Sequence, residues 1–331
     1  HPRVRRQRQM CIRDRCIILQ KGRKMNKINN VIICGLGAIG TIYAEKLKGC
    51  TNLKILADEK RIERYKKNPV IFNGKKCDFD FILPDEKNFK ADLIIISVKN
   101  SGLVDAAASI KNFVDENTII LSLLNGISSE EYLASFCGWE KLLFSYFVGH
   151  TSTRKGSEIT FDGVGEIVFG EKENSEFSQK VLAVKNLFDE TKIDYSIPED
   201  MEYSMWKKFL VNVGTNQASA ILGGAYKLFQ NSEKAMNLAK NFMKEAQKIA
   251  EVSGVKNTEK MLDEALEIIN SMLPETKSSM LQDVEAARKT EVEIFAGKVV
   301  EMGEKFNIPT PYNKIAFEII SALDEKSSLK L

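Results

Sequence analysis

The pattern of apolar and polar positions changes near residue 199. Before it, short apolar runs rich in β-branched residues alternate with stretches of helical periodicity. Continuous apolar runs of this kind are typical of strands buried on both faces of a parallel sheet. The predicted strands are 30–35, 53–58, 91–98 and 118–124, followed by the weaker β-like runs 141–148 and 165–171.

From residue 199 onward, helical periodicity replaces the strand pattern. It extends through 233–254 and 278–307, with breaks expected at Gly254 and Pro274. This order of elements predicts an α/β domain with a parallel sheet, followed by an all-α domain. We place the α/β domain at 25–198 and the helical domain at 199–331.

The first 24 residues have a composition of their own. They carry nine of the 48 Lys and Arg residues and one of the 45 acidic residues, so the rest of the chain has a net charge of −5. Such a basic arm could bind nucleic acid or a membrane surface, or act as a targeting peptide. However, "MCIRDR" resembles a translated sequencing adaptor. We interpret 1–24 as a non-native, adaptor-derived extension and predict neither a nucleic-acid nor a membrane partner.

The composition narrows the class of protein further. Hydrophobic residues make up 44% and charged residues 28%, as in globular domains with a real core, and no apolar run approaches the roughly 20 residues that span a bilayer. The six cysteines contain no CxxC pair, which favours a reducing cytoplasm. With only His1 and His150, a histidine-based zinc site and a Ser-His-Asp triad are not expected, and we predict no metal.

A glycine motif, "GLGAIG", follows the first predicted strand and opens a helix. In such loops the first glycine allows a tight turn, the second lets a pyrophosphate approach the backbone, and the third lets helix and strand pack closely. The free N–H groups of the helix start then favour an anion. We therefore predict a Rossmann-type dinucleotide-binding domain. The loop residues assigned to the cofactor are Gly35, Leu36, Gly37, Ala38, Ile39 and Gly40.

Three further positions at the ends of predicted strands are candidates for the same site. Asp58 closes the second strand, where a carboxylate binds the ribose hydroxyls and favours NAD over NADP. Lys60 or Arg61 could still neutralise a 2′-phosphate, so NADP stays open. Lys99 and Asn125 follow the next two strands, at the edge where open α/β sheets bind ligands. Ordinary turn chemistry is the alternative for Asn125, because Asn-Gly is a common turn dipeptide.

The segment "WKKFLVNVGTN" predicts a polar stripe on a largely apolar helix. Lys208, Asn212 and Asn216 are four residues apart, so they lie on successive turns of one face. Polar groups in a buried helix need partners. Lys207 instead aligns with apolar Val211, and we interpret it as a peripheral lysine.

These segments resemble the ketopantoate reductase family. The matching motifs, in order, are "GLGAIG", "VKN", "LLNG", "WKKFLVNVGTN" and the long segment 278–313, and the resemblance extends from residue 30 to about residue 323. It implies an active site in the cleft between an N-terminal Rossmann domain and a helical domain.

The resemblance also implies roles for individual residues. Lys208 would be the general acid, with the acidic Glu291 near it and near the cofactor. The residues implied to bind substrate are Asn125, Asn212, Asn216 and Ser279, and those implied to approach the cofactor are Lys99, Asn125 and Glu291. Because Ser279 and Glu291 are 12 residues apart, we expect them on roughly one face of a single helix.

The family implies reduction of 2-dehydropantoate (ketopantoate) to (R)-pantoate with NADP or NAD, in pantothenate and coenzyme A synthesis. Asp58 stands where NADP-dependent members often carry arginine, and "GGAY" (223–226) stands where the family may supply a further asparagine. Both departures also fit an NAD-dependent D-2-hydroxyacid dehydrogenase acting on other branched or aromatic 2-keto acids. A nucleotide-binding sensor without turnover is a third reading, and the C-terminal helices could pair two subunits in a homodimer.

Overall fold

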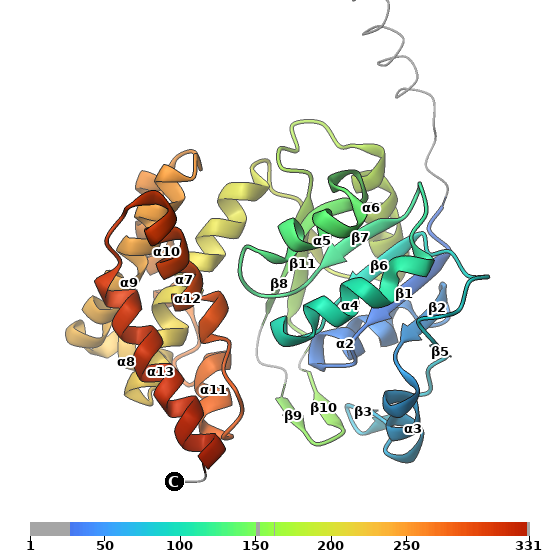
Figure 1. Cartoon of the computed structure of the whole chain (residues 1–331), viewed down its shortest axis with the longest axis horizontal. Helices are drawn as coiled ribbons and strands as arrows, with labels where there is room; N and C mark the ends of the chain where they lie inside the picture. Colours follow the sequence, from blue (N-terminus) through green and yellow to red (C-terminus); the bar gives the residue numbers. More distant parts are fainter. Residues whose placement is uncertain (1–26, 150–152, 162, 330–331) are drawn as a thin grey trace, which may run out of the picture.

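The computed structural model describes residues 27–149, 153–161 and 163–329. The predicted extension 1–24 lies outside them. Figure 1 shows a sheet with helices on its faces and, beside it, a separate group of helices formed by the C-terminal part of the chain. Among the described residues, no helix is both long enough and apolar enough to cross a membrane.

The main sheet has eight strands in the order β12-β11-β8-β7-β6-β1-β2-β5. Its central strands are parallel, and every residue of β6 and β7 is buried. Of the parallel strands, β1, β2, β6 and β7 confirm the first four predicted runs, and β5 was not predicted. Their bounds are β1 (Asn30–Cys34), β2 (Asn52–Leu56), β5 (Phe81–Ile82), β6 (Leu93–Ile96) and β7 (Ile119–Ser122).

One edge of the sheet departs from the all-parallel prediction. The strand β8 (Leu142–Gly149) pairs parallel with β7, but β11 (Gly165–Gly170) runs antiparallel to β8. The edge strand β12 (Tyr195–Ser196) pairs parallel with β11. The weaker runs 141–148 and 165–171 are thus confirmed as strands, within a mixed sheet.

A second, four-stranded sheet was not predicted. It has the order β4-β3-β10-β9, and its strands contain only two or three residues each. Runs this short carry no readable period-2 pattern. The bounds are β3 (Ile71–Phe72), β4 (Lys75–Lys76), β9 (Thr153–Lys155) and β10 (Glu158–Thr160).

Helices cover both faces of the main sheet and bury its apolar side chains in two cores. Ile42 of α2 and Phe188 of α6 pack on one face, and Ala107 of α4 and Leu133 of α5 on the other. In α3 every residue is at least partly exposed. The bounds are α2 (Ala38–Leu47), α3 (Glu59–Lys67), α4 (Leu103–Ile110), α5 (Ser129–Cys137) and α6 (Gln179–Thr191), with 3-10 turns η1 (Asn100–Gly102), η2 (Lys111–Phe113) and η3 (Trp139–Lys141).

The helical part is built around α7 (Met201–Leu222), which begins at the Asp200 cap and ends before Gly223 in a left-handed conformation. It packs against α9, α10, α11 and α13. The predicted breaks at Gly254 and Pro274 are confirmed, and the predicted boundary at 198–199 falls between β12 and α7. The remaining bounds are α8 (Tyr226–Asn231), α9 (Glu233–Val252), η4 (Thr258–Lys260), α10 (Met261–Ser271), α11 (Ser279–Glu285), η5 (Val292–Ile294), α12 (Ala296–Phe306) and α13 (Pro311–Leu329).

The prediction of one helix through 278–307 is wrong. α11 ends at Glu285, Ala287 has a φ of +49°, and α12 begins only at Ala296. The intervening loop is held from far along the chain, since the backbone N–H and the hydroxyl of Thr290 both donate to the carboxylate of Asp324. Local periodicity carries no trace of such a contact, and Ser279 and Glu291 therefore belong to two different segments.

Candidate active site

The glycine loop has the geometry that a dinucleotide requires. Gly35 has a φ of +99°, and a Cβ at Gly40 would collide with the Gly35 carbonyl. α2 begins at Ala38 with Gly37 as its N-cap, so the first N–H groups of the helix have no side-chain cap. A Cβ at Gly37 would meet only the Ser97 carbonyl, at 3.8 Å, which leaves room beside the backbone. Uncapped donors and close access fit a pyrophosphate.

Not every predicted loop residue can contact a ligand with its side chain. The side chain of Leu36 is buried in the core of the sheet domain, with 2% of the residue exposed. Ala38 and Ile39 are partly buried and pack against the same core. We therefore expect these three residues to bind the cofactor through their backbone.

Asp58 is exposed at the end of β2 and caps the next helix. Its Oδ1 accepts the backbone N–H of Arg61 at 2.7 Å, and its Oδ2 lies 3.4 Å from the Arg61 guanidinium. Capping alone would explain an aspartate here. The Asp58 carboxylate is nevertheless exposed, so it can also accept hydrogen bonds from ribose hydroxyls. Arg61 already forms an ion pair with this carboxylate.

Lys208, Asn125 and Glu291 come together from three distant segments. The Lys208 ammonium donates to Asn125 Oδ1 at 3.2 Å, and Asn125 Nδ2 donates to Glu291 Oε2 at 3.2 Å. The ammonium also lies 4.9 Å from the ring centroid of Tyr146 on β8. The two charged neighbours set the orientation of the Asn125 amide, because its oxygen faces a cation and its nitrogen an anion.

Burial changes the proton affinity of this lysine. Desolvation lowers the pKa of Lys208 to about 8, although the carboxylates of Glu291 and Glu130 act in the opposite direction. A lysine with a pKa in this range is protonated at neutral pH and can still release its proton readily. Lys207 is different, since it pairs with Glu264 at 2.8 Å at the edge of the helical part.

The two asparagines of the stripe have different surroundings. Asn216 is buried, and its Oδ1 accepts hydrogen bonds from the Ser279 hydroxyl and the Met280 N–H, both at 3.2 Å. Its amide nitrogen donates to Asn212 Oδ1 at 3.2 Å. This bond turns the Asn212 amide nitrogen away from Asn216. Asn212 and the exposed Ser279 are therefore placed to contact a bound substrate directly, and Asn216 orients their side chains.

Lys99 makes an ion pair that joins the sheet domain to the helical part. Its ammonium lies 3.0 Å from Asp283 Oδ2 on α11, and the other oxygen of Asp283 accepts from Arg288 at 2.7 Å. Asp283 was not singled out from the sequence. Its position in the segment 278–313, four residues after Ser279, was the one available signal.

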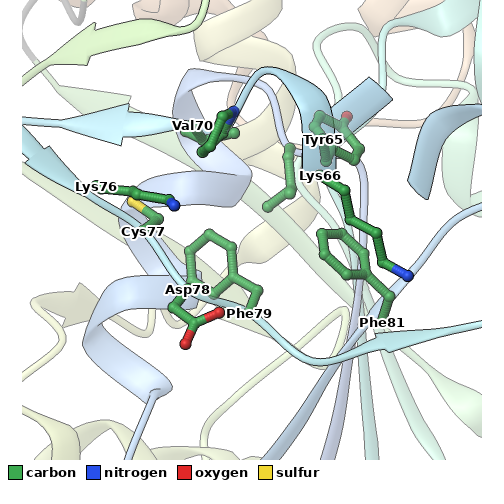
Figure 2. Close-up of a pocket in the computed structure, with 10 residues that line it drawn as sticks. Tyr65, Lys66, Val70, Lys76, Cys77, Asp78, Phe79 and Phe81 are labelled. Carbon is green, nitrogen blue, oxygen red and sulfur yellow. The ribbon is translucent and has the colours of Figure 1, made fainter. Parts of the chain in front are cut away.

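The structure also contains a cavity of about 260 Å³ in the sheet domain, between α3 and the β3–β4 hairpin. Figure 2 shows the aromatic side chains of Tyr65, Phe79 and Phe81 around it. Of the ten residues that line it, Leu36 alone is also a predicted site residue. The cavity is therefore separate from the cluster around Lys208. Across the described ranges, no three His, Cys, Asp or Glu side chains are grouped to hold a metal ion.

A Rossmann-type sheet with a glycine loop, joined to a helical part that contributes a partly buried lysine, defines a two-part nicotinamide-dependent oxidoreductase. The family described as "Ketopantoate reductase PanE/ApbA" matches residues 31–174, and "Ketopantoate reductase PanE/ApbA C terminal" matches residues 200–324. The chain belongs to the ketopantoate reductase family and is an enzyme.

Individual relatives agree over nearly their whole length. The chain is 26% identical to a 2-dehydropantoate 2-reductase of Streptococcus pyogenes serotype M3, over 88% of this chain and 97% of the relative. A D-mandelate dehydrogenase solved with NADH and anilino(oxo)acetate has a TM-score of 0.79 at 22% identity, and a dimeric ketopantoate reductase from Staphylococcus aureus 0.73 at 20%. Each alignment covers 90% of this chain and 99% of the other, and at these identities shows the shared fold.

Proposed function

We propose that the protein reduces 2-dehydropantoate to (R)-pantoate with a nicotinamide cofactor, as a step towards pantothenate and coenzyme A. The observation that carries the proposal is the hydrogen-bonded row Lys208–Asn125–Glu291. It joins a proton donor of the helical part to the loop after β7, at the same sheet edge as the glycine loop. A nucleotide sensor would not need a partly buried lysine with a lowered pKa in this position.

The chain's own residues supply the proton and hold the substrate. The bound nicotinamide would provide the hydride. Lys208 would hydrogen-bond the keto oxygen, polarise the carbonyl and donate the proton that the developing alkoxide needs. Glu291 would keep Asn125 oriented, and its charge favours the protonated form of Lys208.

Substrate recognition would come from the α7–α11 side. Asn212 presents an amide nitrogen that can donate to the carboxylate of a small 2-keto acid. Ser279 donates its proton to Asn216, so its oxygen can accept from a substrate hydroxyl. Asn216 would fix the orientation of the Asn212 and Ser279 side chains through its three hydrogen bonds. We expect Asn216→Ala to raise KM because two contacts lose their support together.

The alternative activity is that of an NAD-dependent D-2-hydroxyacid dehydrogenase with the same lysine mechanism. Its support is Asp58 at the ribose position, together with Tyr226. This tyrosine lies in the "GGAY" segment but is buried in the helical core beside Phe229, so it provides no asparagine-like contact. A pocket with one polar contact fewer would discriminate less between 2-keto acids.

One experiment separates the two activities. The purified enzyme would be assayed with 2-dehydropantoate, 2-ketoisovalerate and benzoylformate, each with NADH and with NADPH. We expect the highest kcat/KM with 2-dehydropantoate. A rate no better than that with 2-ketoisovalerate would refute the primary proposal, and a faster rate with benzoylformate would support the alternative. Nucleotide binding without turnover of any of the three acids would indicate a sensor.

The cofactor and the assembly are separate parts of the proposal. We propose NAD as the preferred cofactor, because the exposed Asp58 carboxylate would repel a 2′-phosphate. We also propose a homodimer formed through α13, where the apolar Tyr312, Ile315 and Ile319 are exposed at intervals of three and four residues. Sedimentation analysis of wild type and Ile315→Asp would test it, and an unchanged mass would exclude α13 as the interface.

A further inference from the structure

A buried carboxyl group outside the proposed reaction lies on α5, the helix that follows the Asn125 loop. Glu130 is in the first turn of α5, and only 3% of it is exposed. Its Oε2 accepts a hydrogen bond from the Ser129 hydroxyl at 2.9 Å. A buried carboxyl group is costly unless it is paired or hydrogen-bonded, and such groups concentrate at functional sites.

A row of serines holds this carboxyl group. The Ser122 hydroxyl at the end of β7 donates to the Ser129 hydroxyl at 2.8 Å, and Ser129 in turn donates to Glu130. Ser145 on β8 donates its hydroxyl to the carbonyl of Ser122 at 2.9 Å. Both side-chain bonds of the row point towards Glu130, and this direction stabilises its ionised form.

Two connections lead from Glu130 to Lys208. The first is along the chain, since Asn125, which accepts the Lys208 hydrogen bond, stands five residues before Glu130. The second runs through β8, where Ser145 adjoins Tyr146, the residue whose ring lies 4.9 Å from the Lys208 ammonium. The carboxylate of Glu130 accordingly favours the protonated form of Lys208.

The charged groups around this pair define the pH range in which they act. Burial raises the pKa of Glu130 to about 7, although Ser129, the backbone of Ser145 and the charge of Lys208 lower it. Lys208, with a pKa of about 8, faces Glu291 as well as Glu130. Burial thus shifts the pKa values of Glu130 and Lys208 towards each other, and each group's charge favours the ionised form of the other.

Tyr146 is the other titratable neighbour. Its pKa is raised chiefly by burial and also by the charge of Glu166. It stays neutral where the carboxyl group and the lysine titrate, so the two carboxylates dominate the charge around Lys208.

We propose that Glu130 is a positioning residue of the reductase, a second counter-charge besides Glu291 that keeps the Lys208 ammonium protonated and directed at Asn125. The proposal rests on the proposed function, because it takes Lys208 as the proton donor. It assigns a role in the reaction to a residue that does not itself touch substrate or cofactor.

The test is the pH profile of kcat/KM for reduction of 2-dehydropantoate by NADH, or of benzoylformate if that is the better substrate. Glu130→Gln keeps the size of the side chain and an oxygen for the Ser129 bond but removes the charge. We expect the basic limb of its profile to move about one pH unit lower. The control is Glu131→Gln, which removes an exposed carboxylate one residue away and should leave the limb in place.

An unmoved basic limb in Glu130→Gln would overturn the proposal, even if kcat fell, because a purely structural role lowers the rate without shifting the limb. If Glu130→Gln does not fold, Ser129→Ala replaces it. That variant keeps the carboxyl group but removes a bond to its ionised form, so we expect a smaller shift in the same direction, and no shift would again contradict us. The proposed function fails separately, if Lys208→Ala keeps its activity.

Discussion

The glycine loop at 35–40 and the cluster around Lys208 are stabilised in opposite ways. The loop lies within one short stretch of chain, and its shape depends on backbone conformation and on the missing Cβ atoms of Gly35 and Gly40. The cluster joins side chains up to 166 residues apart and depends on charge. The comparison implies that the loop is sensitive to added atoms, whereas the cluster is sensitive to removed charges.

Removing the charge at the centre of the cluster should have the largest effect. We expect Lys208→Ala to lower kcat by about 10²- to 10⁴-fold, the usual contribution of a positioned proton donor, while nucleotide binding is retained. Steady-state kinetics and NADH titration by fluorescence would measure the two quantities.

Lys207→Ala is the matched control for that variant. Lys207 is the neighbouring lysine, and its partner Glu264 is outside the cluster. We expect near-normal kcat and a loss of unfolding free energy below about 1 kcal/mol. Equal damage by both substitutions would contradict the assignment of the proton donor.

In the glycine loop, two separate glycine-to-alanine variants should distinguish an effect on folding from an effect on cofactor binding. Gly40→Ala places a Cβ against the Gly35 carbonyl, and we expect it to destabilise the fold by about 1–3 kcal/mol. Gly37→Ala meets only an ordinary contact in the protein, so it should fold normally and bind NADH about tenfold more weakly, a loss of about 1.4 kcal/mol. Thermal unfolding and NADH titration would test both, and normal binding by Gly37→Ala would argue against the pyrophosphate position.

The cluster should also respond to pH, while the loop has no titrating group in this range. The proton donor is the charged form of Lys208, so reduction should proceed fully below a pH of about 8 and decline above it, by about tenfold per unit. The kcat/KM profile from pH 6 to 10 would show this limb, while the Kd for NADH should stay nearly constant. A rate that rises through pH 9 would be inconsistent with Lys208 as the acid.

The smallest expected effect on activity is that of substitutions at Asp58. This residue lies at the predicted cofactor site, like the glycine loop, but acts through its charge. Asp58→Arg should shift the ratio of kcat/KM values towards NADPH by about tenfold and weaken the cap of α3 by about 1 kcal/mol. Asp58→Asn keeps the cap and removes the charge. If Asp58→Asn left the NADPH rate unchanged while Asp58→Arg raised it, the added arginine rather than the lost carboxylate would be responsible.

The sequence predicted the central strands, the loop and the helical part because each depends on local patterns: apolar runs, three glycines and helical periodicity. Spacing alone also favoured Lys208 over Lys207 as the site lysine. The structure places Lys208 beside Asn125 and Lys207 beside Glu264, and the role of Lys208 stays a prediction. The break between Glu285 and Ala296 was missed because it is stabilised by Asp324, a contact between distant residues. The two-residue strands of the second sheet were missed because they are too short to show a period.

Within the site, the sequence predicted which kinds of residue take part better than it predicted which residues they contact. Lys99 was expected beside the cofactor, but its pairing with Asp283 depends on how the two parts of the chain pack. Glu130 was not singled out from the sequence, since burial of a carboxyl group on α5 is a property of the tertiary structure.

The arrangement at Asp283 bears on how the two parts of the enzyme could separate to exchange ligands. Its carboxylate is shared between Lys99 of the sheet domain and Arg288 of its own segment. If Lys99 moved away, Asp283 would keep Arg288, and no buried anion would be stranded. The lost bond would then be an ion pair between a half-exposed lysine and a buried aspartate that retains a second cationic partner. The Lys99–Asp283 pair is thus one contact between the two parts that can open without leaving the Asp283 carboxylate unpaired.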